Sequence, residues 1–227
     1  MKKNFLENIY SSHHIVIFVL YISLIVGFAL NENSTGGAYI DYLGQKQISI
    51  SFSNSFLETL LNFEQEQTRH SPILIMLFSY FEKIELDDLF IRLINLHICL
   101  FLPIFFYKCL KLKFADIENK YLILFSSLIF LSPTFRSLAI WPDSRLWGLT
   151  FFVISIYYFL SYKNDKDFKN CLLTVLFYSI GSYFSPNFSV LSVFFILYFL
   201  RELSLIKNLQ FLTRNLLLAL PAFYYVF

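Results

Sequence analysis

Charged residues are scarce in this sequence. Only 18 Lys and Arg and 16 Asp and Glu occur among its 227 residues, a fraction of 15% where soluble domains carry about 25%. The two signs nearly cancel, with a formal net charge of +2, and no basic groove or basic-aromatic motif is present. The composition therefore argues against nucleic acid as a partner. The 57% of hydrophobic residues argues against a disordered chain.

Cysteine is also rare. Cys99, Cys109 and Cys171 have no paired spacing, so the sequence indicates neither a disulfide framework nor a zinc site. We interpret these three residues as packing residues inside a helical bundle or against lipid.

Long apolar runs are what the sequence has instead. A membrane-spanning segment must satisfy its own backbone hydrogen bonds, and uninterrupted apolar runs favour helices over the alternating pattern of barrel strands. We therefore predict an all-α, polytopic transmembrane bundle of about six to eight apolar helices. The runs are Ile15 to Leu30, Leu89 to Tyr107, Tyr121 to Leu131, Leu146 to Leu160, Cys171 to Phe184, Phe188 to Leu200 and Leu216 to Phe227.

The first and last runs bear on the extent of the chain. Lys2 and Lys3 precede the first run as in a signal peptide, but no small-residue cleavage site follows, which indicates a retained first helix. The last run stops at Phe227 without a polar flank. We therefore expect residues 1–227 to form a single integral membrane domain that is the N-terminal part of a longer chain.

The basic residues predict a topology. Cytoplasmic loops are enriched in Lys and Arg, and one assignment places four basic clusters inside, with a cytoplasmic N-terminus in a bacterial inner membrane. In this assignment the short apolar segment after Pro72 does not cross. The clusters are Lys2 and Lys3; Lys108, Lys111, Lys113 and Lys120; Lys163, Lys166 and Lys169; and Arg201, Lys207 and Arg214.

The same assignment leaves mostly Arg on the outer side. Arg69, Arg92, Arg136 and Arg145 lie there with only two Lys. Because a guanidinium binds phosphate oxygens at two points, this excess predicts a phosphate site. Interfacial snorkelling, or ordinary ion pairs with acids such as Asp143, remains the alternative explanation.

The long outer loop, Asn31 to Asp88, is expected to carry one amphipathic helix. Ser55 and Glu58 have the spacing of a capping box. An apolar stripe with polar residues opposite follows and predicts a helix lying on the bilayer surface. Pro72 stands where it can open the next helix. The stripe consists of Phe56, Leu57, Leu60, Leu61 and Phe63.

One predicted helix has a polar face. Arg92, Asn95 and Cys99 recur at spacings of three and four residues, so they share one side. A lipid-facing Arg would be costly, and this face should point into the bundle. Pro103 is expected to kink the same helix. Trp141 favours the headgroup level and places Asp143 at the membrane surface.

Several of these motifs together resemble a known family. The layout is similar to that of the GT-C membrane glycosyltransferases, in particular the protein-mannosyltransferase and aminoarabinose-transferase type, over roughly residues 5 to 165. The motifs are Gly36-Gly-Ala-Tyr-Ile-Asp41-Tyr42 in the first outer loop, His70-Ser-Pro72 opening a short helix, Asp88-Leu-Phe-Ile-Arg92, and Ser132-Pro133 before a polar loop.

The resemblance implies a function. It implies transfer of a sugar from a polyprenyl-phosphate donor to a glycan, lipid or protein acceptor at the outer membrane face. Asp41 would deprotonate or orient the acceptor hydroxyl, and Asp143 would assist acceptor positioning or a divalent ion. The residues expected to hold the donor phosphate are Arg69, His70, Arg92, Arg136 and Arg145.

The sequence departs from the commoner family pattern at one point, because a lone Asp41 stands where two adjacent acids are often seen. Metal dependence and the identity of the base are therefore open. Two other classes are also open: a transporter, flippase or polymerase subunit for lipid-linked saccharides, and a noncatalytic membrane scaffold.

Overall fold

The computed structural model describes residues 12–66, 68 and 71–226, and the side chains of these ranges between residues 15 and 220. Every regular element in the described part is a helix. The elements are α1 (Ser12–Ala29), α2 (Ala38–Asn54), α3 (Phe56–Leu61), the 3-10 helix η2 (Phe63–Glu66), α4 (Pro72–Lys83), α5 (Asp88–Cys99), α6 (Phe101–Lys113), α7 (Asn119–Ser127), the 3-10 helix η3 (Leu128–Leu131), α8 (Pro133–Ile140), α9 (Ser144–Asp165), α10 (Phe168–Phe184), α11 (Asn187–Glu202) and α12 (Leu205–Val226).

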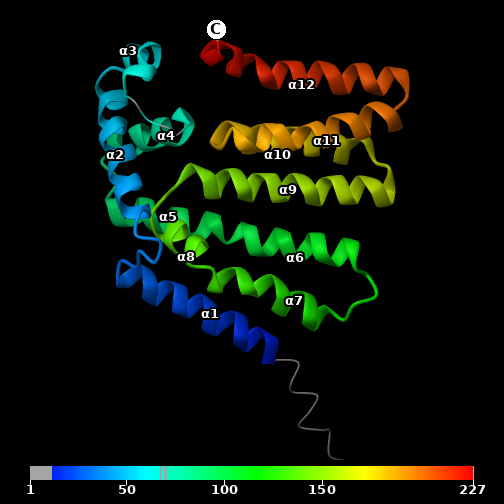
Figure 1. The fold of residues 1–227 in the computed structure, drawn as a ribbon, viewed down its shortest axis with the longest axis horizontal. Helices are drawn as coiled ribbons and strands as arrows, with labels where there is room; N and C mark the ends of the chain where they lie inside the picture. Colours follow the sequence, from blue (N-terminus) through cyan, green and yellow to red (C-terminus); the bar gives the residue numbers. More distant parts are fainter. Residues whose placement is uncertain (1–11, 67, 69–70, 227) are drawn as a thin grey trace, which may run out of the picture.

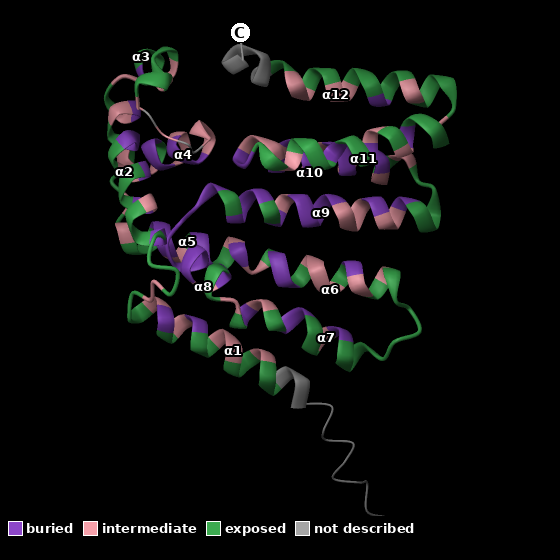
Figure 2. Cartoon of the chain, viewed as in Figure 1, coloured by how far each residue is buried: buried purple, intermediate pink, exposed green. Residues whose placement is uncertain are grey.

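The long helices form rows, and shorter ones cover one end. Figure 1 shows α1, α7, α6, α9, α10 and α12 lying across the molecule while α2 stands at one end of them. Neighbouring rows pack directly, α6 against α7 and α9, and α10 against α9, α11 and α12. Figure 2 shows burial concentrated in α9 and around α5 and α8, and exposure along α12. The central helix α9 is therefore the one the others enclose.

Two helices in the described part are long and apolar enough to cross a membrane. One is Asp88–Lys113, which joins α5 and α6, and the other is Ser144–Asp165. A third span results if the pair Asn119–Leu131 and Pro133–Ile140, bent by 67°, is counted as one. The prediction of an all-helical chain with helices able to span a membrane is thus confirmed for the described residues. The predicted number of six to eight spans stays a prediction.

The basic connections share one end of the bundle. Figure 1 places the links between α6 and α7, α9 and α10, and α11 and α12 at the end opposite α2 and α8. These three links contain or adjoin the later basic clusters, for example Lys111, Lys166 and Lys207. If Lys and Arg are concentrated in cytoplasmic loops, these three links must lie on the same side of the membrane, which their position at one end of the bundle allows. The side of the membrane that it faces stays a prediction.

Helix α2 is the main difference from the sequence analysis, which expected a loop before residue 55. Tyr42, Gln45, Ser49 and Phe52 are buried at helical spacing, and α2 packs along α4. Because two of these four positions are polar, the apolar periodicity that signals an amphipathic helix is weak. The helix forms through burial against α4 despite a sequence that reads as a polar loop.

The expected amphipathic helix is shorter than its stripe. Helix α3 ends at Leu61, and η2 continues the chain. The Ser55 hydroxyl hydrogen-bonds the Glu58 carboxylate at 2.9 Å, and Ser55 makes no side-chain cap to the backbone. The capping-box prediction is therefore wrong in its geometry. In contrast, Pro72 occupies the first turn of α4, with Ser71 before it, as predicted.

Helices α9 and α10 cross at two glycines. A Cβ on Gly148 would lie 2.7 Å from Ser185 Cβ and 3.0 Å from the Gly181 carbonyl oxygen. A Cβ on Gly181 would lie 3.0 Å from the Gly148 carbonyl oxygen. Such close backbone approach is the reason that small residues occur at helix crossings in membranes.

This crossing predicts opposite outcomes for two Gly→Ala substitutions. Gly148→Ala should destabilise the protein by about 1 to 3 kcal/mol, because the added methyl overlaps α10. Gly44→Ala, in the middle of α2 where nothing lies within 4 Å of the new methyl, should stabilise by up to about 1 kcal/mol. Thermal unfolding of the purified protein in detergent measures both, and equal effects would contradict the crossing.

The arrangement of the ends predicts the outcome of surface labelling. Asn54→Cys at the end of α2 and Asn164→Cys at the end of α9 introduce exposed thiols, whereas the three native cysteines are buried. In intact cells, an impermeant maleimide should label the first variant and leave the second unlabelled until the membrane is opened. Labelling of both from the outside would overturn the predicted topology.

Candidate functional site

The polar loop expected after Ser132-Pro133 is largely helical, since α8 occupies Pro133–Ile140. Ser132 caps α8 by accepting a hydrogen bond from the Phe135 N–H at 3.3 Å, and Pro133 occupies the first turn. After Ile140 the chain is extended through Trp141. Asp143 then caps α9. Two short-range capping signals thus fix where α8 and α9 begin.

Helix α5 holds the C-terminal end of α8. Asn95 Nδ2 donates to the carbonyl oxygens of Leu138 at 3.1 Å and Ala139 at 2.7 Å, and Arg92 Nε donates to that of Ile140 at 3.2 Å. These carbonyls belong to the last turn of a helix, which has no partners of its own for them. The buried polar face predicted for Arg92, Asn95 and Cys99 is confirmed, since each is at most 8% exposed.

Asn95 also connects α5 to α9. Its Oδ1 accepts a hydrogen bond from Trp147 Nε1 at 2.6 Å, and both side chains are buried. Trp147 therefore lies inside the bundle. One amide side chain thus holds α5, α8 and α9 together.

Arg92 lies between aromatic rings. Its guanidinium carbon is 3.7 Å from the Trp141 ring centroid and 4.9 Å from that of Phe28. Only 8% of the residue is exposed, and Nη2 is buried without a hydrogen-bond partner. Arg92 does not line the pocket described below. Its cation is stabilised by ring faces and by the α8 C-terminus.

Arg136 is paired with an acid that the sequence analysis did not single out. Its Nε donates to the two carboxylate oxygens of Glu32 at 2.8 and 3.0 Å, and Nη2 donates to Oε2 at 2.5 Å. Nη1 and Nη2 also donate to the hydroxyl and carbonyl of Ser23. Trp141 Nε1 donates to the Glu32 carbonyl at 3.0 Å. Arg136 is therefore occupied in joining α1 to α8.

Gly27 makes room for this pair. A Cβ at Gly27 would lie 2.3 Å from Glu32 Oε2 and 2.8 Å from Arg136 Nη2. The hydrogen bond from Arg136 holds the pKa of Glu32 below its ordinary value of 4.5, against an opposing effect of burial.

A second network joins α2 to α5. The Tyr42 hydroxyl and Lys46 Nζ both donate to Asp88 Oδ1, the latter at 2.8 Å. Lys46 Nζ also lies 3.9 Å from Glu82 Oε1. Burial and, after it, the hydrogen bond to the Asp88 carboxylate raise the pKa of Tyr42. Tyr42 therefore stays a neutral donor at physiological pH.

Asp41, Asp143 and Arg145 form one cluster. Arg145 donates through Nε and Nη2 to the two oxygens of Asp143 at 2.9 and 2.7 Å, and through Nη2 to Asp41 Oδ2 at 2.8 Å. Asp143 is fully buried, whereas the side chains of Asp41 and Arg145 are 40% and 54% exposed. The ion-pair explanation considered for the outer Arg residues therefore applies to Arg145.

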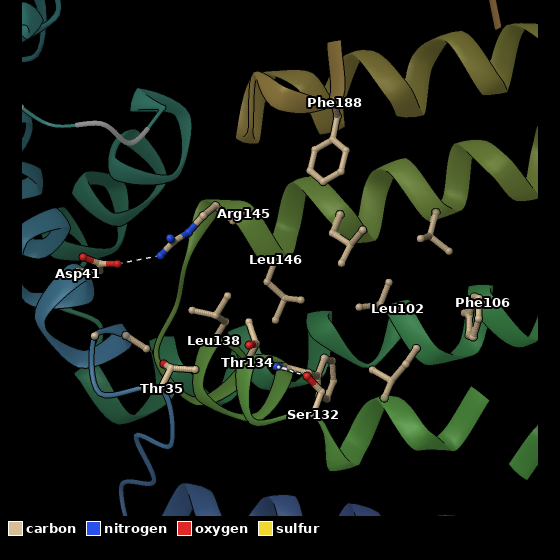
Figure 3. A pocket seen from close by; sticks show the side chains of 16 residues that line it. Thr35, Asp41, Leu102, Phe106, Ser132, Thr134, Leu138, Arg145, Leu146 and Phe188 are labelled. Atoms are coloured by element: carbon tan, nitrogen blue, oxygen red, sulfur yellow. Dashed lines mark hydrogen bonds and ion pairs between the residues drawn. The ribbon is translucent and has the colours of Figure 1, made fainter. Parts of the chain in front are cut away.

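Asp41 and Arg145 line a pocket of about 750 Å³. Figure 3 shows the Arg145 guanidinium extending toward Asp41, with Thr35, Ser132 and Thr134 on the opposite side. The rest of the wall is mostly apolar. The apolar lining comes from α6, η3, α8, α9 and α11 and consists of Leu102, Phe106, Ile129, Phe135, Leu138, Leu146, Leu149, Val153 and Phe188, with Gly37 and Ala38 at the start of α2.

The predicted site residues thus fall into separate places. The structure brings together Asp41, Asp143 and Arg145, and puts Arg92 and Arg136 in neighbouring contacts away from the pocket lining. Arg69 and His70 lie outside the described residues. Sequence reasoning missed Glu32, Thr35 and Thr134. The Ser132-Pro133 pair, which is a helix-start signal after which a polar loop was expected, could have pointed toward the last of these.

The acids of the cluster do not fit a shared divalent ion. The Arg145 guanidinium already lies against both Asp41 and Asp143, and a second cation between them would be repelled. Among the described residues, no group of three or more His, Cys, Asp and Glu could hold a metal ion.

No protein-family model, curated protein or solved structure matches this chain.

The Glu32 pair predicts an acid-dependent loss of stability. Because the folded pKa is lowered, the pair's contribution is complete above the ordinary carboxyl pKa and is lost as the pH falls below about 4.5 through the folded value. Glu32→Gln should lower the free energy of unfolding at pH 7 by about 1 to 3 kcal/mol and flatten this pH dependence. Thermal melts at several pH values test it, and parallel curves for the two proteins would contradict it.

Proposed function

We propose that this protein is a membrane glycosyltransferase. In this proposal it transfers a sugar from a polyprenyl-phosphate donor to a hydroxyl group of a glycan, lipid or protein acceptor at the outer face of the membrane. The observation that carries the proposal is the pair of Asp41 and Arg145, a carboxylate and a guanidinium 2.8 Å apart, at the edge of a largely apolar pocket.

The chemistry needs these two groups. The acceptor hydroxyl attacks the anomeric carbon on the face opposite the phosphate, and its proton passes to the Asp41 carboxylate. The bond between the anomeric carbon and the phosphate oxygen breaks, and its electron pair leaves with the phosphate. Arg145 stabilises the negative charge that develops on that oxygen. Attack from the opposite face inverts the anomeric centre.

The pocket supports an amphiphilic, anionic donor. Its walls include the first turns of α2, α8, α9 and α11, through Ala38, Thr134, Arg145 and Phe188. Free N–H groups and the positive end of the helix dipole favour anions at such turns. The apolar wall along α6 and α9 suits an isoprenoid chain. A noncatalytic scaffold would not need these features in one cavity.

The membrane setting belongs to the same proposal. It comprises about six to eight spans, a cytoplasmic N-terminus in a bacterial inner membrane, and α3 lying on the outer surface. Leu57 and Leu61 support this position for α3, since they are 71% and 67% exposed and have no evident partner other than lipid among the described residues.

A transporter or flippase for lipid-linked saccharides is the second candidate. It is favoured by the break at Ser132, where Asn119–Leu131 and Pro133–Ile140 meet at 67°. Broken helices whose half-helix N-termini meet an anionic substrate are a feature of secondary transporters. Both candidates use the same pocket, and they differ in whether a covalent bond changes.

Asp41→Asn should separate the two candidates. If the protein is a transferase whose base is Asp41, the full-length Asp41→Asn variant in vesicles should transfer sugar about 10² to 10⁴-fold more slowly than the natural protein. Transfer is measured with a radiolabelled polyprenyl-phosphate sugar and extracts of the cell envelope as acceptor. The matched control is Glu82→Gln, which removes an outer acid that does not line the pocket, and this variant should transfer normally.

Two results would count against this assignment. Undiminished transfer by Asp41→Asn would remove Asp41 from the role of base. Movement of the labelled lipid across the bilayer without any change in its sugar linkage would favour the transporter.

A further inference from the structure

Arg145 has two carboxylate partners that are held very differently. Asp143 accepts the Arg145 Nε, Nη2 and backbone N–H at 2.9, 2.7 and 2.7 Å, and is fully buried. Asp41 accepts from Nη2 alone at 2.8 Å, and its side chain is 40% exposed. One guanidinium is thus shared between a fixed acid and a half-exposed one.

This inequality decides which partner can leave. Separating Asp143 from Arg145 would leave a carboxylate buried without its cation, which is strongly unfavourable. Asp41 can exchange the guanidinium for water, and exposed ion pairs of this kind contribute little. An anion that approaches Arg145 from the pocket therefore replaces Asp41 and not Asp143.

The position of the pair in the pocket gives this exchange a consequence. Asp41 and Arg145 come from α2 and α9, and both line the cavity; Figure 3 shows their contact reaching from one helix to the other. While the contact lasts, Nη2 of Arg145 and one Asp41 oxygen are occupied by each other, and an anion can reach the guanidinium only through Nη1. Once it opens, Nη1 and Nη2 can bind the anion at two points, and Asp41 has both oxygens available.

We propose that the Asp41–Arg145 ion pair is an autoinhibitory latch, which the phosphate group of the ligand opens by taking the place of Asp41 on Arg145. This inference rests on the proposed function, since it concerns the same pocket. In it, Asp143 is a positioning residue that keeps the guanidinium directed into the pocket through the exchange. Phosphate binding then releases the base only when the donor is present.

Binding measurements test the latch without reference to catalysis. The full-length protein in lipid nanodiscs is titrated with farnesyl phosphate, with uncharged farnesol, and with inorganic phosphate. The variants are Asp41→Asn, Arg145→Gln and Glu82→Gln. Asp41 is half-exposed, so its variant should fold, and an unchanged melting temperature and elution profile confirm this for Asp41→Asn and Glu82→Gln. Arg145→Gln leaves the buried Asp143 without its cation and should melt at a lower temperature, so an unchanged elution profile is its test of folding.

The latch predicts a gain of affinity. Asp41→Asn should bind farnesyl phosphate about two- to fivefold more tightly than the natural protein, because the competing carboxylate is gone. Arg145→Gln should bind farnesyl phosphate at least about tenfold more weakly than the natural protein. Glu82→Gln should match the natural protein, and farnesol should bind all four alike. The same gain with inorganic phosphate would assign the latch to phosphate itself, and a gain with farnesyl phosphate alone would assign it to the lipid-linked form.

Three results would overturn the latch. The first is equal or weaker binding of farnesyl phosphate by Asp41→Asn. The second is a gain in Glu82→Gln as large as that in Asp41→Asn, which would reveal a general charge effect. The third is no saturable binding by any variant, which would remove the donor site as well. In contrast, absence of sugar transfer with the gain in affinity intact would overturn the proposed function and leave the latch standing.

Discussion

The structure depends on the capping of one short helix. Helix α8 has only eight residues, and its last carbonyl groups are enclosed by α5, so their hydrogen bonds must come from side chains. Asn95 and Arg92 provide them. Without these donors, α8 would have no fixed end and the chain from Trp141 to Asp143 no fixed path. The position of Arg145 at the start of α9 follows from that path.

The need to provide partners for buried polar groups also explains why the three Arg side chains of this region have different partners. In a bundle of low polarity an unpaired charge is costly. Arg92 is stabilised by two ring faces and a helix end, and Arg136 by a two-point contact with Glu32. Arg145 has a buried acid on one side and a half-exposed acid on the other. Of these three, only Arg145 lines the pocket, and only Arg145 has a half-exposed partner that it can exchange at a low cost in free energy.

Local patterns in the sequence were sufficient for some parts of this arrangement. Pro72 marks a helix start because its signal acts within one turn, and the spacing of Arg92, Asn95 and Cys99 identifies a buried face. A polar loop is expected from the sequence after Ser132-Pro133, whereas helix α8 begins there. The long-range pairs carry no such signal. Glu32 with Arg136, and Asp41 with Arg145, are each 104 residues apart. Their pairing depends on how α1 and α2 dock on α8 and α9, which no local spacing encodes. Helix α2 was missed for a related reason, since its buried positions include Gln45 and Ser49, and their burial depends on α4.

The glycine crossing of α9 and α10 gives the pocket an uneven stiffness. On the α9 side, Gly148 and Gly181 bring the two backbones so close that there is no room for a side chain between them. On the opposite side the wall is η3, a 3-10 segment with weaker hydrogen-bond geometry, whose Leu128 and Leu131 are 54% and 58% exposed. A bulky molecule that entered the pocket would therefore displace η3 more readily than α9, and the α9 wall, from which Arg145 projects, would keep its shape.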